Sequence, residues 1–288
     1  MTVTAAMVKE LREKTGAGIL DAKKALTEND GDMEKAMEYL RQKGIASAEK
    51  KMGRIAAEGL VDSYIEGKAG ALIEVNCETD FVAKNDEFKA LVKNLAKQVV
   101  LKKPANVDEL LASTCDECGK KVEDIIKEKV ATIGEKITVR RFEIVEGNPA
   151  TYIHNGKIGV LLNTDCADEA MEKDICLHIA SNAPEFVSRT EIPQSVIDEE
   201  TRIEMGKEDL AKKPEQIRAK IVEGRINKLM ASKCLLEQPF VKNPDQTVGQ
   251  LIEGKLNIKS FIRYTLGEGL EKRQDNFAEE VASQMAGK

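Results

Sequence analysis

The chain of 288 residues carries a net charge of −6, with 42% hydrophobic and 33% charged residues, so it is long enough for two or three domains with cores of their own. Only 4% of the residues are aromatic and none is Trp, which argues against nucleic-acid binding, because such proteins usually combine a basic surface with stacking side chains. The sequence has no signal-like start and no apolar run near the ~20 residues that a membrane-spanning helix needs. We therefore expect a cytoplasmic protein without a direct nucleic-acid or membrane partner.

Residues 1–54 predict a small bundle of three short helices with a helical linker. Thr4 and Asp32 are suited to cap the first and third helices, and we expect the third helix to end at Gly44. Beyond Gly44 the chain is rich in Ala, Lys and Glu with few large apolar side chains, which is typical of a helical linker. The side chains of the second helix that are expected to face the bundle interior are Leu20, Ala22, Ala25 and Leu26.

The rest of the chain contains an internal repeat, which predicts an α+β core of two related subdomains, residues 55–148 and 149–288. Residues 67–73 match residues 156–162 at an offset of 89, that is, 156 minus 67. Each copy is expected to begin as a β-hairpin, continue into a helix and close with a strand. The two helices are expected at residues 86–101 and at roughly 171–180.

The second copy carries an insertion, which predicts an antiparallel helical arm at about residues 190–230. The closing strands match at Arg141 and Arg263, an offset of 122 (263 minus 141), and this exceeds the first offset by 33 (122 minus 89). Pro193 and Pro214 can open two charged helices with thin apolar stripes, which we expect a partner or a second copy to cover. The stripes consist of Val196, Ile203, Ile217 and Ile221. A last helix is expected to carry Phe277, Val281 and Met285.

Cys115 and Cys118 form the only CxxC motif of the chain. The motif lacks the second ligand pair of a zinc site and the preceding strand of a thioredoxin-like unit. Its inner residues are both acidic, which disfavours a thiolate. Incidental reduced thiols are the favoured interpretation, and a redox dithiol is the alternative.

The sequence shows no motif that would hold a nucleotide or carry out catalysis. Neither G-x-x-x-x-G-K-[ST] nor G-x-G-x-x-G occurs. His154 and His178 are far apart in sequence, and the nearest acidic partner, Asp174 one turn before His178, is more typical of a surface or core pair than of a catalytic dyad. We expect a protein that is not an enzyme and that binds neither a metal nor a cofactor.

The stretch Thr79-Asp80-Phe81-Val82 interrupts this pattern with a polar corner and an aromatic ring. It lies between the apolar run at residues 71–75 and the helix expected at 86–101, and connections of this kind run over the surface. Phe81 and Val82 either staple the start of the helix or expose an apolar corner for a partner.

Two segments resemble the signatures of the translation elongation factor Ts family. They are residues 11–26, with the sequence LREKTGAGILDAKKAL, and residues 74–82, with the sequence EVNCETDFV. The repeat, the arm and the expected last helix also fall where that family has them. Ala22 stands where many members have Cys, and Ile19 and Leu20 replace side chains that are often Met, so the apolar character is kept.

The resemblance implies a guanine-nucleotide exchange factor for elongation factor Tu with a UBA-like N-terminal bundle. It implies that the corner Thr79, Asp80, Phe81 and Val82 enters the partner beside its nucleotide site and displaces Mg²⁺. It further implies that Arg12, Ile19 and Leu20 meet the partner's G domain, that His154 contacts its other domains, and that the arm can join two complexes. A scaffold that binds its partner without altering nucleotide release is the alternative.

Overall fold

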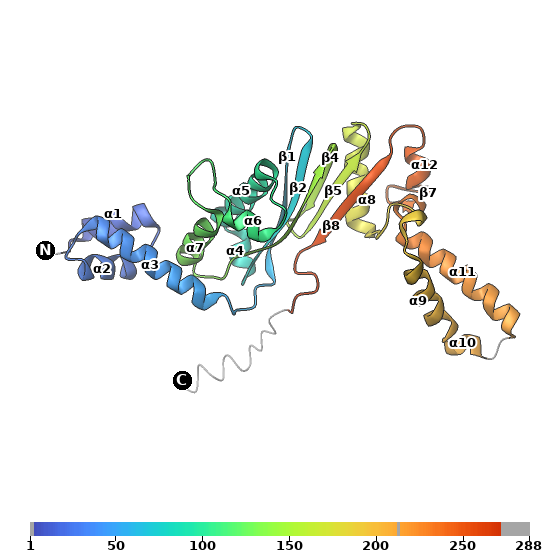
Figure 1. Ribbon diagram of the computed structural model, residues 1–288, viewed down its shortest axis with the longest axis horizontal. Coiled ribbons are helices and arrows are strands. Elements are labelled where there is room, and N and C mark those ends of the chain that lie inside the picture. The colour runs from blue at the N-terminus through green and yellow to red at the C-terminus, as the bar shows by residue number, and fades with distance from the viewer. Residues whose placement is uncertain (1–2, 212–213, 272–288) are drawn as a thin grey trace. The chain divides into compact units, whose positions relative to one another are not determined.

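The computed structural model describes residues 3–211 and 214–271, and these form an α+β fold with two three-stranded sheets and one two-stranded sheet (Figure 1). The sheets have the strand orders β1-β2-β3, β4-β5-β8 and β6-β7. By its contacts the described part of the chain divides into two compact units, one built from its residues up to 62, from 73 to 142 and from 265 onward, the other from its residues between 63 and 72 and between 143 and 264.

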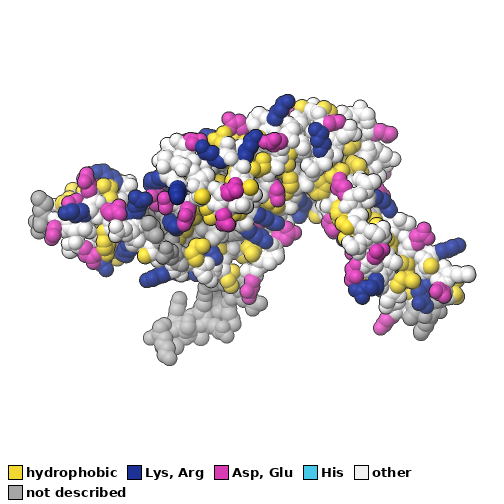
Figure 2. Space-filling model, in the orientation of Figure 1, with side chains coloured by type: hydrophobic (Ala, Val, Ile, Leu, Met, Phe, Trp, Pro, Cys, Tyr) yellow, Lys and Arg dark blue, Asp and Glu magenta, His cyan; other side chains and the backbone are white. Residues whose placement is uncertain are grey.

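The surface carries charges of both signs. On the face seen in Figure 2, Lys and Arg side chains are interspersed with Asp and Glu side chains. None of the helices in the described part of the chain combines the length and the apolar character needed to cross a bilayer.

The N-terminal helices are α1 (Ala5–Thr15), α2 (Ile19–Glu28) and α3 (Met33–Lys51). The hydroxyl of Thr4 accepts the N–H of Met7 at 3.3 Å and caps α1, as its sequence predicts. Asp32 caps α3 through the N–H groups of Glu34 and Lys35. The fully buried side chains of this bundle are Leu11, Ala22, Ala25, Leu26 and Ala36.

The expectation that Leu20 faces the bundle interior is wrong, because its side chain is 82% exposed. Ala22 and Leu26, one helical turn apart, define the inner face of α2. Leu20 is two residues before Ala22 and so lies on the opposite side of a helix with 3.6 residues per turn.

The expectation that Gly44 ends the third helix is also wrong, because α3 continues to Lys51. α3 packs against α7 (Val122–Ile133), a helix that periodicity analysis missed. A Cβ on Gly44 would lie 2.8 Å from the Cβ of Ala131 on α7, closer than two such atoms approach. Gly44 therefore permits two helices to pack closely rather than ending one of them.

The first sheet consists of β1 (Glu58–Glu66), β2 (Ala69–Cys77) and β3 (Thr138–Glu146). Between β2 and β3 lie α4 (Asp80–Lys84), α5 (Asp86–Lys102), α6 (Val107–Ala112) and α7. The helix expected at residues 86–101 is confirmed as α5, capped by Asn85. Its buried apolar face includes Phe88, Leu91, Val92, Leu95 and Val99.

The other unit holds β4 (Asn148–His154), β5 (Ile158–Thr164), α8 (Glu169–Asn182) and β8 (Ile258–Thr265). β4 pairs antiparallel with β5 from Asn148↔Thr164 to His154↔Ile158. The turn between them has a positive φ at both Asn155 (51°) and Gly156 (68°), as the tight Asn-Gly turn predicts. The smaller elements are β6 (Pro239–Phe240), β7 (Asn243–Thr247) and α12 (Val248–Ile252).

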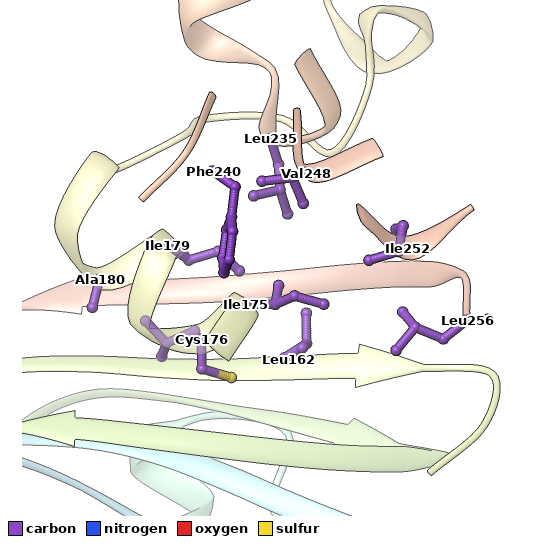
Figure 3. Packing of buried hydrophobic residues seen from close by; sticks show 11 residues of the cluster. Leu162, Ile175, Cys176, Ile179, Ala180, Leu235, Phe240, Val248, Ile252 and Leu256 are labelled. Atoms are coloured by element: carbon purple, nitrogen blue, oxygen red, sulfur yellow. The ribbon is translucent and has the colours of Figure 1, made fainter. Parts of the chain in front are cut away.

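The core of this unit lies between the sheet and α8. Figure 3 shows Ile175 and Ile179 of α8 meeting Leu162 of β5 and Phe240 of β6. His178 is buried beside this cluster, where its Nε2 lies 2.8 Å from Oε1 of Gln238 and its Nδ1 accepts the N–H of Val241. Burial lowers the pKa of His178. His178 is therefore a hydrogen-bonded core residue, and Asp174 pairs with Lys242 instead.

Helices form in the expected arm region as α9 (Gln194–Met205), α10 (Glu208–Ala211) and α11 (Glu215–Lys233), and α9 lies beside α11 (Figure 1). Val196 and Ile221 pack inside the arm. Ile203 and Ile217 are 49% and 51% exposed, so only part of the expected apolar stripe reaches the surface. The helix expected at Phe277, Val281 and Met285 lies outside the described residues.

A buried carboxylate fastens β2 to its neighbours. Glu74 is fully buried, and its oxygens accept from the guanidinium groups of Arg140 (2.9 Å) and Arg141 (2.7 Å) on β3 and from the N–H of Gly267 (2.8 Å). Burial raises the pKa of Glu74, but the Gly267 N–H and the two guanidinium groups outweigh burial and hold it below the ordinary value. The segment that follows β8 is thus fixed to the middle of β2.

Replacing Gly44 by Ala should lower the free energy of unfolding, although Ala ordinarily stabilises a helix. The added methyl group would clash with the Cβ of Ala131, which cannot move away unless the backbone of α7 also moves. Overpacking of this kind costs about 1–3 kcal/mol. Gly224→Ala on α11 is the matched control, because a Cβ there meets nothing within 4 Å and should stabilise by about 0.5–1 kcal/mol. Denaturant unfolding followed by circular dichroism measures both, and equal stabilisation by the two variants would refute close packing at Gly44.

Replacing Glu74 by Gln should destabilise the protein by about 3 kcal/mol at pH 7, because it leaves two partly buried guanidinium groups without their carboxylate. Since the folded-state pKa of Glu74 is lowered, its stabilisation is present above the ordinary carboxyl pKa of about 4.3 and is lost as the pH falls through the folded value. Urea unfolding at pH 7 and pH 4 should show a larger difference between the two proteins at pH 7. An unchanged or larger difference at pH 4 contradicts this assignment.

Candidate partner-binding site

The corner between β2 and α5 folds as a one-turn helix, α4, rather than as an open loop. The hydroxyl of Thr79 accepts the N–H of Val82 at 3.3 Å, which caps this turn. Asn85 then accepts the N–H of Glu87 at 2.7 Å and starts α5. Two successive caps thus set the path of the chain through the corner.

Phe81 points out of this turn and is 81% exposed. A hydrophobic staple requires its apolar residue to pack against the following helix. The exposure of Phe81 contradicts that interpretation and leaves the interpretation of an exposed apolar corner. Val82 is half-buried, and Ala83 is the residue of this turn that faces the core.

Asp80 forms an ion pair with Lys84 one turn later, at 2.6 Å. Its side chain is 47% exposed and that of Lys84 is 74% exposed, so solvent screens the pair. The carboxylate lies beside the ring of Phe81 in sequence and remains accessible from outside.

The backbone of the corner is held by Glu135, which lies between α7 and β3. One oxygen of Glu135 accepts the N–H groups of Glu78 (3.1 Å) and Thr79 (2.9 Å), and the other accepts the hydroxyl of Thr79 (2.6 Å). The residues joined are 56 and 57 positions apart in sequence. Sequence reasoning missed Glu135, because no local pattern brings it to the corner.

Glu78 continues this network toward the end of the bundle. Its carboxylate accepts the N–H of Lys136 at 2.6 Å and pairs with Arg54 at 3.2 Å. The ammonium group of Lys136 donates to the carbonyl of Arg54 at 2.9 Å. The segment between α3 and β1 is therefore tied to the same corner.

The thiol of Cys77 lies beneath the corner and donates to the carbonyl of Thr79 at 3.1 Å. Burial, with the carboxylate of Glu135 nearby, raises the pKa of Cys77 to about 12. The thiol therefore stays protonated at neutral pH and serves as a hydrogen-bond donor rather than as a nucleophile.

The other residues singled out from the sequence lie on different elements. Arg12 is exposed on α1, and Ile19 and Leu20 are 57% and 82% exposed on α2, in the unit that also contains Phe81. His154 lies at the end of β4 in the other unit, where its ring stacks on Tyr152 at a centroid distance of 6.1 Å.

The CxxC motif forms an exposed turn between α6 and α7. Cys115 is half-buried and Cys118 is exposed, and both are free thiols. The two acidic residues between them, Asp116 and Glu117, pair with Lys102 and Lys97 of α5. In the part of the chain that the structure describes, no group of three or more His, Cys, Asp or Glu side chains is placed to hold a metal.

A comparison with known families gives a match. A family model described as Elongation factor TS covers residues 78–268, more than half of the 288 residues. The matched region begins at Glu78 in the corner and includes Phe81, Glu135 and the arm. On this match and the architecture described above, the chain belongs to the elongation factor Ts family.

Proposed function

We propose that this chain is a guanine-nucleotide exchange factor that binds elongation factor Tu with GDP and accelerates release of the nucleotide during translation elongation, in the cytoplasm. Membership of the elongation factor Ts family implies exchange on elongation factor Tu. The observation that carries the mechanism is the side chain of Phe81, which is 81% exposed on a turn fixed by hydrogen bonds on both sides. Burial in a partner would remove this apolar surface from water.

The corner acts as a wedge at the partner's phosphate site. A GTPase holds GDP largely through its phosphate loop and a Mg²⁺ ion, and both depend on the helices that support them. The ring of Phe81 enters between these supporting elements, shifts them and thereby displaces Mg²⁺. Val82 follows the ring into the contact, and Thr79 keeps the turn closed. No covalent step is needed.

Asp80 supplies a hydrogen-bond acceptor next to the ring. Its exposed pair with Lys84 contributes about 1 kcal/mol or less, so exchanging this pair for backbone N–H groups of the partner would cost little. Such N–H groups become available when the phosphate loop reorients.

Further contacts hold the two proteins together while the corner acts. Arg12, Ile19 and Leu20 of the N-terminal bundle, which we expect to be of the UBA-like kind, meet the G domain. His154, at the end of β4, meets the partner's other domains. Once one of these contacts has formed, the others form within the same complex, so their effective concentration is raised. The exposed Ile203 and Ile217 of the helical arm give a second copy of the complex a place to bind.

Replacing Phe81 by Ala should slow stimulated GDP release by about tenfold or more, because loss of one central aromatic anchor typically costs about 2 kcal/mol of interface energy. The fold should be unaffected, since the ring is exposed. Release of labelled GDP from elongation factor Tu measures the effect. Leu101→Ala, which truncates an apolar side chain 45% exposed on α5, is the control and should leave release unchanged. Normal stimulation of GDP release by a folded Phe81→Ala variant would refute the wedge mechanism.

Excess GDP should dissociate a nucleotide-free complex of the two proteins, and Mg²⁺ should lower the GDP concentration required. If the chain weakens binding of GDP to the partner by some factor, GDP must weaken binding of the chain by the same factor. Titration of GDP into the isolated complex, with and without Mg²⁺, followed by gel filtration, tests this linkage. A scaffold that binds both states equally would stay bound at saturating GDP.

A further inference from the structure

An exposed ring on a short helix cannot hold its own position. α4 spans only Asp80–Lys84, and a helix of this length is unstable by itself in water. The ring of Phe81 is 81% exposed, so packing of the ring contributes little to its placement. A wedge that must arrive in a defined geometry therefore needs support from elsewhere in the chain.

Glu135 provides this support through three hydrogen bonds. Two of them come from the successive N–H groups of Glu78 and Thr79, which enter the turn, at 3.1 and 2.9 Å. Hydrogen bonds to a carboxylate are roughly twice as strong as those between neutral groups. They also satisfy backbone donors at the start of a helix that would otherwise lack partners.

The third bond sets the orientation of the cap. The hydroxyl of Thr79 has one proton, and it donates this proton to Glu135 at 2.6 Å. Its lone pairs are then left to accept the N–H of Val82 at 3.3 Å, which closes the turn that carries Phe81. Glu135 thus acts on the ring through Thr79.

The position of Glu135 is in turn determined by α7. Gly134, with φ of 91°, ends α7 and directs the chain back so that Glu135 reaches the corner. The last turns of α7 pack against the N-terminal bundle, where a Cβ on Gly16 or Gly44 would lie 3.0 Å from Thr132 or 2.8 Å from Ala131. The same few residues therefore contact the bundle on one side and lead directly to Glu135 on the other.

We propose that Glu135, held at the end of α7, is a positioning residue for nucleotide exchange that keeps the Asp80–Phe81 corner in place. The proposal rests on the proposed function for its activity test, but the loosening of the corner is measurable without a partner. In this role Glu135 acts through the backbone of Glu78 and Thr79 and not by direct contact with the nucleotide or its ion.

Replacing Glu135 by Ala should release the corner. Hydrogen exchange of the peptide that contains residues 78–84 should accelerate, since the N–H groups of Glu78 and Thr79 lose their acceptor. The maximal rate of stimulated GDP release should fall by about tenfold, because misplacement of a reacting element by about 1 Å has effects of this size or larger. The chain concentration that gives half-maximal stimulation should change less than about threefold, because other contacts supply most of the affinity.

Glu135→Gln gives an intermediate test. It keeps one acceptor oxygen for the two N–H groups but offers an amide donor where the hydroxyl of Thr79 now donates. Its maximal rate of stimulated GDP release should lie between the rates of the native chain and the Ala variant. Glu123→Ala is the matched control on α7, because this carboxylate pairs with Lys127 on the surface, and it should change neither measurement.

The outcomes separate the proposal from the function on which it rests. Unchanged hydrogen exchange of residues 78–84 in Glu135→Ala overturns the positioning role. Faster hydrogen exchange of residues 78–84 with a normal maximal rate of GDP release also overturns it, provided that Phe81→Ala, tested in parallel, slows GDP release. If Phe81→Ala stimulates GDP release normally, the wedge mechanism fails. Faster hydrogen exchange in Glu135→Ala would then still support Glu135 as the residue that holds the corner. Equal losses in maximal rate and in affinity, with a lowered melting temperature, would assign Glu135 to stability alone.

Discussion

The position of Phe81 depends on polar bonds made by its neighbours, because a ring left in water contributes almost nothing to its own placement. The corner meets this constraint by satisfying backbone N–H groups with side chains: Thr79 accepts from within the turn, and Glu135 accepts from across the unit. Beneath them, the thiol of Cys77 is kept protonated by burial and donates to the same segment. The exposed apolar surface and the fixed backbone of the corner are thus supplied by different residues.

The same division of roles recurs in the bundle. Ala22 and Leu26 stabilise α2 from inside, whereas Leu20 on its outer face is exposed and contributes little to the core. A substitution of the outer residue should therefore have little effect on folding. In the arm, Val196 and Ile221 pack between α9 and α11, whereas Ile203 and Ile217 are exposed.

Features that depend on a few adjacent residues could be predicted from the sequence. The caps at Thr4 and Asp32 and the Asn155-Gly156 turn follow from local hydrogen bonding and backbone preference. What could not be predicted depends on residues distant in the chain. Gly44 has the sequence properties of a helix end, but its role is set by Ala131 of α7, and Glu135 gains its role only when β2 and β3 bring it beside Thr79.

The contact between Gly44 and Ala131 limits how this family member can change over time. A larger side chain at either position separates α3 from α7, so an accepted change at one must be accompanied by a loss of volume at the other or by a shift of a whole helix. Gly44→Ala could be offset by Ala131→Gly, whereas a larger side chain at position 131 cannot be offset at position 44, which already lacks a side chain. The two sites are therefore expected to drift together or not at all, so that among related sequences the pair carries information that neither position carries alone.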